Sequence, residues 1–357
     1  MKAMLTGLGL MALSACTGTE DTPISPAVGI DAAVTVQAAV YDTAIDITSI
    51  FGGGGNGHAY GISAAGLVVG DHNSRPFTWQ QPSGSVRILT QPPTVAGIGS
   101  ATGVSPNGRW IAGEASPLGV PIYHAVVWDV ARRPRDLGTL GGSNSWAIAV
   151  DDQGRVVGWA ETGRGIMHAF LYTPGSGMQD LGALPGSFRS AQMQAWDINA
   201  NGVIVGCGNG ASGNYEMWSW TSAGGLQLLG PGVGFTCAHG VNSAGRITGV
   251  TDFQQPGSGF TWSAGRGFIL HATQGGSGNG HDINRSGFAA GEENFTSAYV
   301  ADPTGSVTYL PTLQPSLFPN AAAGAFAIID CGDVVGWAHD PFLGQARAVW
   351  WPGHQCS

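Results

Sequence analysis

The feature that most constrains this chain is a motif that occurs seven times. Each copy begins at a small residue, passes through Ile or Val followed by a residue such as Asn, Asp or Ser, and ends on a short apolar run and Gly, as in Ala59–Gly70 (AYGISAAGLVVG). The copies recur every 42 to 48 residues and close on these glycines: Gly70, Gly113, Gly158, Gly206, Gly249, Gly291 and Gly336. A regular period of this length indicates a repeat architecture in which each copy forms one structural unit.

Each copy predicts four short strands. The first strand precedes a turn such as Asn199–Gly202, and the second contains the apolar run that ends on Gly. The third strand has an aromatic end, as in His168–Tyr172, and the fourth resembles Arg135–Leu140. Four strands per copy, joined by Gly or Pro turns, are typical of a propeller blade. We therefore predict an all-β fold, a seven-bladed β-propeller with four-stranded antiparallel blades.

The two ends of the chain predict how the ring closes. The seventh copy stops after its third strand, Ala346–Trp351. The segment before the first copy, Ile45–Gly53, aligns with Asp136–Gly142, which contains a fourth strand. We expect this N-terminal strand to complete the last blade, because closure removes the exposed sheet edges that an open array would leave.

Two of these segments resemble a known family. The sequences at 168–172 (HAFLY) and 136–142 (DLGTLGG) are similar to the bacterial extracellular HAF repeat family, and the resemblance covers about residues 41–351. Only the third copy keeps the His-Ala-Phe triplet, since the second reads His124-Ala125-Val126. The resemblance implies propeller-like repeats and an extracellular location, and it transfers no catalytic residue to this chain.

The N-terminus predicts export. Lys2, the apolar stretch 4–13 and the Leu-Ser-Ala-Cys sequence ending at Cys16 form the pattern of a bacterial lipoprotein signal peptide, in which Cys16 is lipidated. An ordinary secretory signal with a coincidental cysteine is the alternative. Thr17 follows the cysteine where an inner-membrane retention signal has Asp, so we expect the outer membrane or cell surface.

These observations divide the chain into three parts. We assign residues 1–16 to the lipoprotein signal peptide, 17–38 to a flexible tether and 39–357 to the propeller. No later apolar run is long enough to span a bilayer, so the lipid anchor is the expected membrane attachment.

Four cysteines follow Cys16, and an even number in an exported chain favours disulfide bonds. Among three possible connectivities, the simplest joins Cys207 to Cys237 and Cys331 to Cys356. Metal binding is the weaker alternative, because none of these cysteines lies in a CxxC pair. We predict neither a metal site nor a cofactor.

Charge and motifs exclude several function classes. The formal net charge is −9 and there is no run of Lys or Arg, which argues against nucleic acid or an acidic membrane surface as partner. The sequence has no GxSxG, HExxH, P-loop or EF-hand signature. The Glu292-Glu293 pair is expected to be solvated surface, and the recurring Asp136 and Asp180 are expected to bond backbone amides at a turn.

One position of the repeat varies where the period does not fix the residue type. It lies in the innermost strand and is occupied by Tyr60, Thr102, Ile148, Trp196, His239, His281 and Phe326. The candidate ligand-binding residues are the aromatic and polar ones, together with the two aspartates that follow them: Tyr60, Trp196, Asp197, His239, His281 and Asp282. We expect them to converge near the mouth of the propeller channel, where rings and polar groups suit a carbohydrate. The alternative is that these residues only pack between blades.

Three functions are compatible with this pattern. The leading one is a non-catalytic, monomeric binding or scaffold module of the cell envelope, which engages a glycan or an extracellular protein through its loop-bearing face. The second is a carbohydrate-active enzyme resembling a polysaccharide lyase, with His239, His281 and Tyr60 in a central cleft. The third is a purely architectural subunit with no small-molecule site.

Overall fold

The computed structural model describes residues 41–52, 54–81, 83–230, 234–253 and 257–353. The predicted signal peptide with Cys16, the tether and Cys356 lie outside the described residues. In the described ranges, no helix is both long and apolar enough to cross a membrane.

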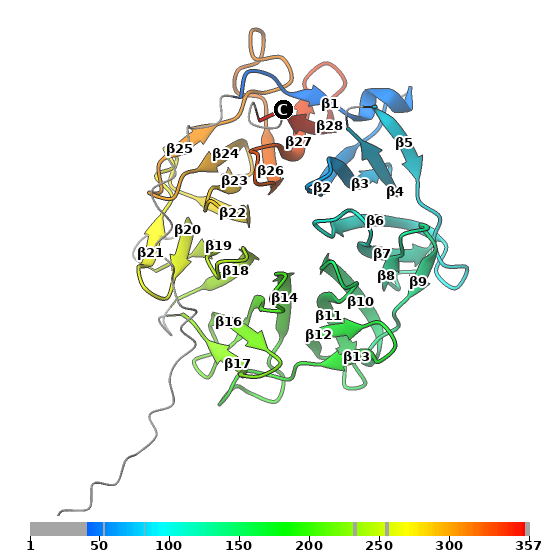
Figure 1. Cartoon of the computed structure of the whole chain (residues 1–357), viewed down its shortest axis with the longest axis vertical. Coiled ribbons are helices and arrows are strands. Elements are labelled where there is room, and N and C mark those ends of the chain that lie inside the picture. The colour runs from blue at the N-terminus through cyan, green and yellow to red at the C-terminus, as the bar shows by residue number, and fades with distance from the viewer. Residues whose placement is uncertain (1–40, 53, 82, 231–233, 254–256, 354–357) are drawn as a thin grey trace, which may run out of the picture. The chain divides into compact units, whose positions relative to one another are not determined.

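The predicted fold is confirmed: seven four-stranded antiparallel sheets are arranged as blades around a common axis (Figure 1). Numbered by blade from 1 to 7, the innermost strands are β2 (Gly57–Ile62), β6 (Gly97–Val104), β10 (Gly141–Val150), β14 (Met193–Ile198), β18 (Thr236–Val241), β22 (Gly278–Ile283) and β26 (Ala323–Ile328). The second strands are β3 (Leu67–His72), β7 (Ile111–Pro117), β11 (Val156–Thr162), β15 (Ile204–Asn209), β19 (Ile247–Thr251), β23 (Ala289–Glu293) and β27 (Val334–Asp340).

The outer half of each blade completes the sheet. The third strands are β4 (Arg75–Gln80), β8 (His124–Trp128), β12 (Met167–Thr173), β16 (Tyr215–Thr221), β20 (Ser258–Ser263), β24 (Ser297–Ala301) and β28 (Gln345–Trp351). The outermost strands are β5 (Ser85–Ile88), β9 (Pro134–Asp136), β13 (Gly177–Asp180), β17 (Gly225–Leu228), β21 (Gly267–Leu270), β25 (Val307–Tyr309) and, for blade 7, β1 (Ile45–Asp46). A short 3-10 helix, η1 (Thr48–Phe51), follows β1.

The ring closes as the sequence predicts. Strand β1 pairs antiparallel with β28, with Asp46 opposite Val349, so the two ends of the propeller share blade 7 (Figure 1). Arg347 Nε donates a hydrogen bond of 3.0 Å to Asp46 Oδ2. Non-covalent closure of this kind leaves no unpaired blade at the junction.

The same third-to-fourth-strand contact recurs inside the ring. In blade 2, His124 Nδ1 lies 2.9 Å from Asp136 Oδ2, and in blade 3, His168 Nδ1 lies 2.9 Å from Asp180 Oδ2. Asp136 and Asp180 also accept a backbone N–H two residues later, which confirms their predicted role at the turn. Arg347 therefore takes the histidine position of this contact in the closing blade.

The hydrophobic core lies between adjacent blades rather than at one centre. One buried cluster joins Ala112 and Val127 of blade 2 to Val150 and Phe170 of blade 3, and the other clusters repeat this arrangement. Each blade thus buries its apolar faces against its neighbours, which is why a single copy of the repeat would not be stable alone.

Each innermost strand contains an irregularity at the same place, and β10 has a second one between Gly141 and Ser145. The pairing register between first and second strands shifts around one residue in every blade, which is the mark of a β-bulge. The closing glycine of the motif lies opposite the start of this bulge. In blade 1, a Cβ at Gly70 would overlap the carbonyl oxygen of His58, and in blade 3 a Cβ at Gly158 would overlap that of Trp146. The glycine recurs because the two backbones approach too closely for any side chain.

A candidate ligand-binding site on the propeller axis

The seven bulge residues form what we call the axial belt. They are the variable residues that the sequence singles out: Tyr60, Thr102, Ile148, Trp196, His239, His281 and Phe326. A bulge leaves one residue unpaired and re-aims its side chain. All seven are half-buried, and the strands that carry them surround the axis (Figure 1).

The structure brings four of the predicted ligand-binding residues into one series of ring contacts. The Trp196 ring lies 4.8 Å from that of His239, centroid to centroid, and His239 stacks on His281 at 5.9 Å. Phe326 lies 5.1 Å from His281 and stacks on Tyr60 at 5.6 Å. These five residues come from blades 4 to 7 and blade 1, so the series of ring contacts runs around the axis through five of the seven blades.

Two further tryptophans extend this series into blade 3. Trp159 lies 5.1 Å from Trp196, and Trp146 lies 6.4 Å from Trp159, measured between ring centroids. We call Trp146, Trp159 and Trp196 the tryptophan arc. Large, half-exposed aromatic faces of this kind cover the apolar faces of sugar rings.

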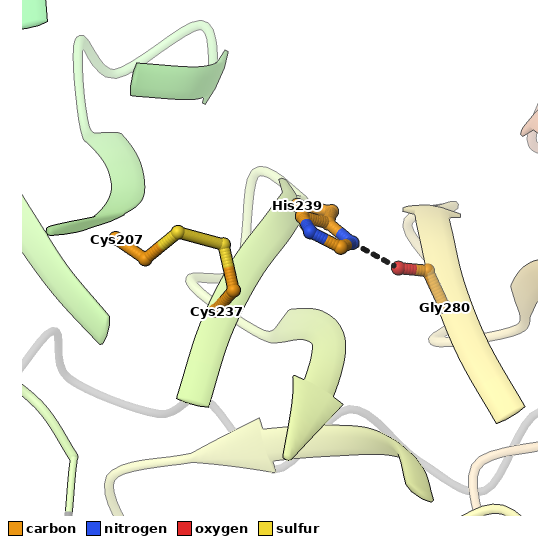
Figure 2. The surroundings of a disulfide bond; sticks show 4 residues. All are labelled: Cys207, Cys237, His239 and Gly280. Carbon is orange, nitrogen blue, oxygen red and sulfur yellow. Dashed lines mark hydrogen bonds between the residues drawn. A yellow bond between two sulfur atoms is a disulfide. The ribbon is translucent and has the colours of Figure 1, made fainter. Parts of the chain in front are cut away.

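A disulfide bond joins blade 4, which carries Trp196, to blade 5, which carries His239. Cys207 on β15 of blade 4 is bonded to Cys237 on β18 of blade 5, with a Cα–Cα distance of 4.8 Å (Figure 2). This confirms the first predicted pair and shows that it links two blades. The predicted partner of Cys331 is Cys356, which lies outside the described residues.

His239 follows Cys237 by two residues and has a defined hydrogen bond. Its Nδ1 lies 3.0 Å from the carbonyl oxygen of Gly280 in blade 6 and donates to it (Figure 2). Burial, with a contribution from the neighbouring His281, lowers the pKa of His239 to about 3. The imidazole is therefore neutral at physiological pH, with the proton on Nδ1 and a lone pair on Nε2 that can accept a hydrogen bond.

The two predicted aspartates have a different role from the rings. Asp197 accepts backbone hydrogen bonds from Ile198, at 2.7 Å, and from Val241 of the next blade, at 2.8 Å. Asp282 makes the same two kinds of bond, the second with the backbone N–H of Ile328 in blade 7. Burial, reinforced by Asp282, raises the pKa of Asp197 to about 7. Asp197 and Asp282 therefore connect adjacent blades through hydrogen bonds to the backbone.

A second ring of residues was not recognised from the sequence. It consists of the residue after each closing glycine: Asp71, Glu114, Trp159, Cys207, Val250, Glu292 and Trp337. The sequence analysis ends the second strand at the glycine, but the structure continues it, so these residues pair with the innermost strand beside the axis. The residue type varies at this position although the preceding glycine does not, and this variation was the signal that could have identified these residues.

We call the three acidic members of this ring, Asp71, Glu114 and Glu292, the carboxylate arc. The expectation that Glu292 and Glu293 are solvated surface is wrong, since each is only 5% exposed. Glu293 accepts hydrogen bonds from Gly275 and Tyr309, whereas Glu292 faces His281 of the axial belt. Strand β23 buries both because it runs on to Glu293.

Asp71 and Glu114 influence each other across adjacent blades. Asp71 Oδ1 lies 3.2 Å from His58 Nδ1. Burial, together with the charge of Asp71 and against a hydrogen bond from Ser100, raises the pKa of Glu114 to about 7. Burial and both carboxylates raise the pKa of Tyr60 well above its usual range. The site is thus electronegative in blades 1 and 2.

In the part of the chain that the structure describes, no three His, Cys, Asp or Glu side chains are grouped to hold a metal ion. The candidate site therefore consists of aromatic rings, neutral imidazole and carboxylates.

No family model matches this chain. No curated protein matches it in sequence either. The prediction of a HAF repeat therefore stays a prediction.

Several solved structures are similar in fold. The β-propeller domain of the Trilobed protease from Pyrococcus furiosus is 10% identical, with a TM-score of 0.52, and the match covers 89% of this chain and 95% of that one. A chain of the mitotic checkpoint complex is 12% identical, with a TM-score of 0.54, over 92% of this chain and 100% of that one.

Two longer proteins are matched over about half their length. A prolyl endopeptidase is 14% identical, with a TM-score of 0.51, over 83% of this chain and 50% of that one. TolB from Acinetobacter baumannii is 17% identical, with a TM-score of 0.45, over 60% of this chain and 53% of that one. At such identities the similarity shows the propeller fold and nothing about its ligand.

Proposed function

We propose that this chain is a non-catalytic glycan-binding module whose ligand site is the axial belt with the tryptophan arc. The observation that carries the proposal is the unbroken series of half-buried rings from Trp146 to Tyr60. Sugar rings present apolar faces to such side chains and hydroxyl groups to the polar atoms between them.

Unpartnered polar atoms beside the belt support this proposal. Among the described residues, Trp196 Nε1, His281 Nε2 and Asn279 Oδ1 are buried without a hydrogen-bond partner. A buried polar atom without a partner costs about 1–3 kcal/mol. The indole nitrogen donates, the amide oxygen accepts and the imidazole nitrogen does either according to its tautomer, and a sugar hydroxyl can satisfy each of these roles.

The disulfide supports the exported location that the proposal requires. Disulfides persist in oxidising compartments outside the cytosol, and Cys207–Cys237 is buried between two blades. Together with the predicted lipidation of Cys16 and the HAF-like repeats, it supports a lipid-anchored monomer on the cell envelope. Its ligand would approach the axis through the loops between blades.

The electrostatics of the site favour binding over the lyase-like alternative. A lyase needs a base that titrates near the working pH. Two of the residues predicted for this role do not meet that requirement, because the pKa of Tyr60 is raised far from that range and the pKa of His239 is lowered to about 3. Glu114, whose pKa is raised to about 7, does titrate near it. The carboxylate arc would also repel the uronate groups of an acidic polysaccharide.

The test uses the full chain in detergent against a panel of bacterial and algal polysaccharides, recording both retention and chain shortening. We expect retention without shortening. Trp196→Ala should weaken retention about 30-fold or more, because a central aromatic contact is worth about 2 kcal/mol or more in a binding site. Trp220→Ala, a half-buried tryptophan on the third strand of the same blade, is the matched control and should retain wild-type binding.

Other outcomes would redirect the proposal. Equal retention by Trp196→Ala and Trp220→Ala would remove the axial belt as the site. Shortening that disappears in His239→Ala or His281→Ala would replace the binding module by an enzyme. Absence of any glycan binding would leave an extracellular protein as the partner.

A further inference from the structure

We infer that the axial site selects saccharides that carry free amino groups, with the ammonium group bound at the carboxylate arc. This inference rests on the proposed glycan-binding function and specifies the class of glycan. It is carried by the charge of the site, by one nearly unpartnered carboxylate and by the rings that surround that carboxylate.

The axis carries acidic residues and no permanent cation. Neither the axial belt nor the ring of residues after the closing glycines contains Arg or Lys, and the chain has no lysine after Lys2. Among the described residues the one buried arginine, Arg347, pairs with Asp46 at the ring closure. The carboxylate arc therefore creates a negative potential that the protein itself does not neutralise.

Glu292 is the strongest single indication of a bound donor. Its side chain is 6% exposed, and no described residue donates a hydrogen bond to it within normal geometry. Its nearest polar neighbour is His281 Nε2 at 3.4 Å, an atom that itself has no hydrogen-bond partner among the described residues. Asn279, which pairs with Glu292 across the two strands, has an unpartnered Oδ1. A buried carboxylate is costly unless a charged donor binds it.

An ammonium group meets these requirements better than a hydroxyl group does. It supplies three donors and a positive charge, so it can bond the carboxylate of Glu292 and the amide oxygen of Asn279 together. A neutral sugar supplies only weaker hydrogen bonds, and a uronate would bring a second negative charge into the arc.

Aromatic rings connect Glu292 to Asp71. A Cβ at Gly324 would overlap both Glu292 Oε2 and Trp337 Nε1, so the two side chains approach the same glycine. Trp337 lies 6.4 Å from His58, centroid to centroid, and His58 contacts Asp71. A cation placed beside Trp337 would gain both cation–π and carboxylate interactions.

The blade 1 and blade 2 carboxylates support the same ligand class. Asp71 and Glu114 repel each other, and this repulsion adds to burial in raising the pKa of Glu114. A bound ammonium group would favour the ionised form of Glu114. The two ends of the arc could thus hold successive amino groups of one oligosaccharide.

The experiment compares three oligosaccharides with the full chain in detergent, by calorimetric titration at low salt: a glucosamine hexamer, its N-acetylated counterpart and a galacturonate hexamer. The first two share a backbone and differ only in the amino group. We expect the glucosamine hexamer to bind at least tenfold more tightly than the N-acetylated one, and the galacturonate hexamer to bind most weakly. High salt should reduce this preference.

Glu292→Gln should bring the ratio of the affinities for the glucosamine hexamer and the N-acetylated hexamer close to one. The amide keeps the shape of the Glu292 side chain and loses its charge. Glu216→Gln is the matched control, since Glu216 is equally buried (8% exposed) on β16, the third strand of blade 4, and should keep the wild-type preference. If Glu292→Gln does not fold, Asp71→Asn and the salt dependence of the wild-type protein test the same charge.

Equal or tighter binding of the N-acetylated hexamer by the wild-type protein would overturn the amine inference and leave the proposed glycan-binding function standing. The amine inference is overturned in the same way if Glu292→Gln and Glu216→Gln both keep the preference. Failure of every glycan in the polysaccharide panel, and of all three hexamers, would overturn the proposed function together with this inference.

Discussion

Trp159 of the tryptophan arc and the three residues of the carboxylate arc occupy equivalent positions of the same repeat. Trp159 follows the closing glycine of blade 3 and Asp71 follows that of blade 1, and each pairs with the innermost strand of its own blade in the same register. The backbone is the same, but one side of the axis presents indole rings and the other presents carboxylates. The repeat thus fixes where a side chain is displayed, and the residue type decides what that side of the axis can bind.

Independently of the two arcs, the blades differ in how they are joined to one another. Asn199 donates a side-chain hydrogen bond to the backbone of Asn242 in the next blade, Asn242 does the same to Asn284, and Asn284 to Ile329. Blades 4 to 7 thus form a continuous series of such ties. Blade 1 has Ser63 at this position, and its hydroxyl bonds within its own turn.

We expect the largest effect from substitution of the closing glycine, which precedes a residue of each arc. Gly158→Ala and Gly70→Ala each place a Cβ against a carbonyl oxygen of the innermost strand, so the backbones must separate. We expect each variant to lose about 3 kcal/mol or more of unfolding free energy, to a similar extent. Guanidinium unfolding measures the loss.

Gly265→Ala is the control for these variants, because a Cβ there has open space and should change stability by less than about 1 kcal/mol. A large loss in one blade only would show that the shared backbone does not explain both arcs.

The next variant should change stability without changing the ligand preference that we assign to the carboxylate arc. The double variant Cys207→Ala/Cys237→Ala removes a bond that spans 30 residues and joins blades 4 and 5. We expect a loss of about 3 kcal/mol, because the unfolded chain regains the entropy of that loop. The unfolding midpoint in guanidinium checks it, while the preference for amine-bearing hexamers should stay unchanged. A loss of that preference would contradict the assignment of the two arcs to separate roles.

The last effect concerns pH. Glu114 has a folded-state pKa of about 7 against an ordinary value of 4.5, so the folded chain keeps a proton that the unfolded chain loses in between. Stability should therefore fall as pH rises from about 4.5 to 7. Asp197 contributes in the same direction, from 3.8 to about 7. Thermal unfolding between about pH 4.5 and 8 measures the combined slope.

Glu114→Gln should reduce this loss by about 3 kcal/mol, since Gln stays neutral and can still accept a hydrogen bond from Ser100. Asp197→Asn should instead destabilise the fold at every pH, because both carboxylate oxygens accept backbone N–H groups and an amide nitrogen cannot. An unchanged slope in Glu114→Gln would mean that Glu114 is not the group that titrates.

The amino-acid sequence was sufficient to predict the number of blades, the closure through Asp46 and β28, the Cys207–Cys237 pair and the variable position that forms the axial belt. All of these follow from the period, because residues at one position of a repeat share one environment. Trp196 and His239 could be recognised as neighbours for the same reason.

The contacts across blades, in contrast, depend on the assembled ring. The structure showed that Asp197 is used by the backbone of the next blade, and that Asp71, Glu114 and Glu292 gather beside the axis. The physical reason is that local sequence determines the strands of one blade, whereas closure of the ring determines which residues of other blades lie beside them. Burial and charge at the axis arise from that closure, and no single copy of the motif contains them.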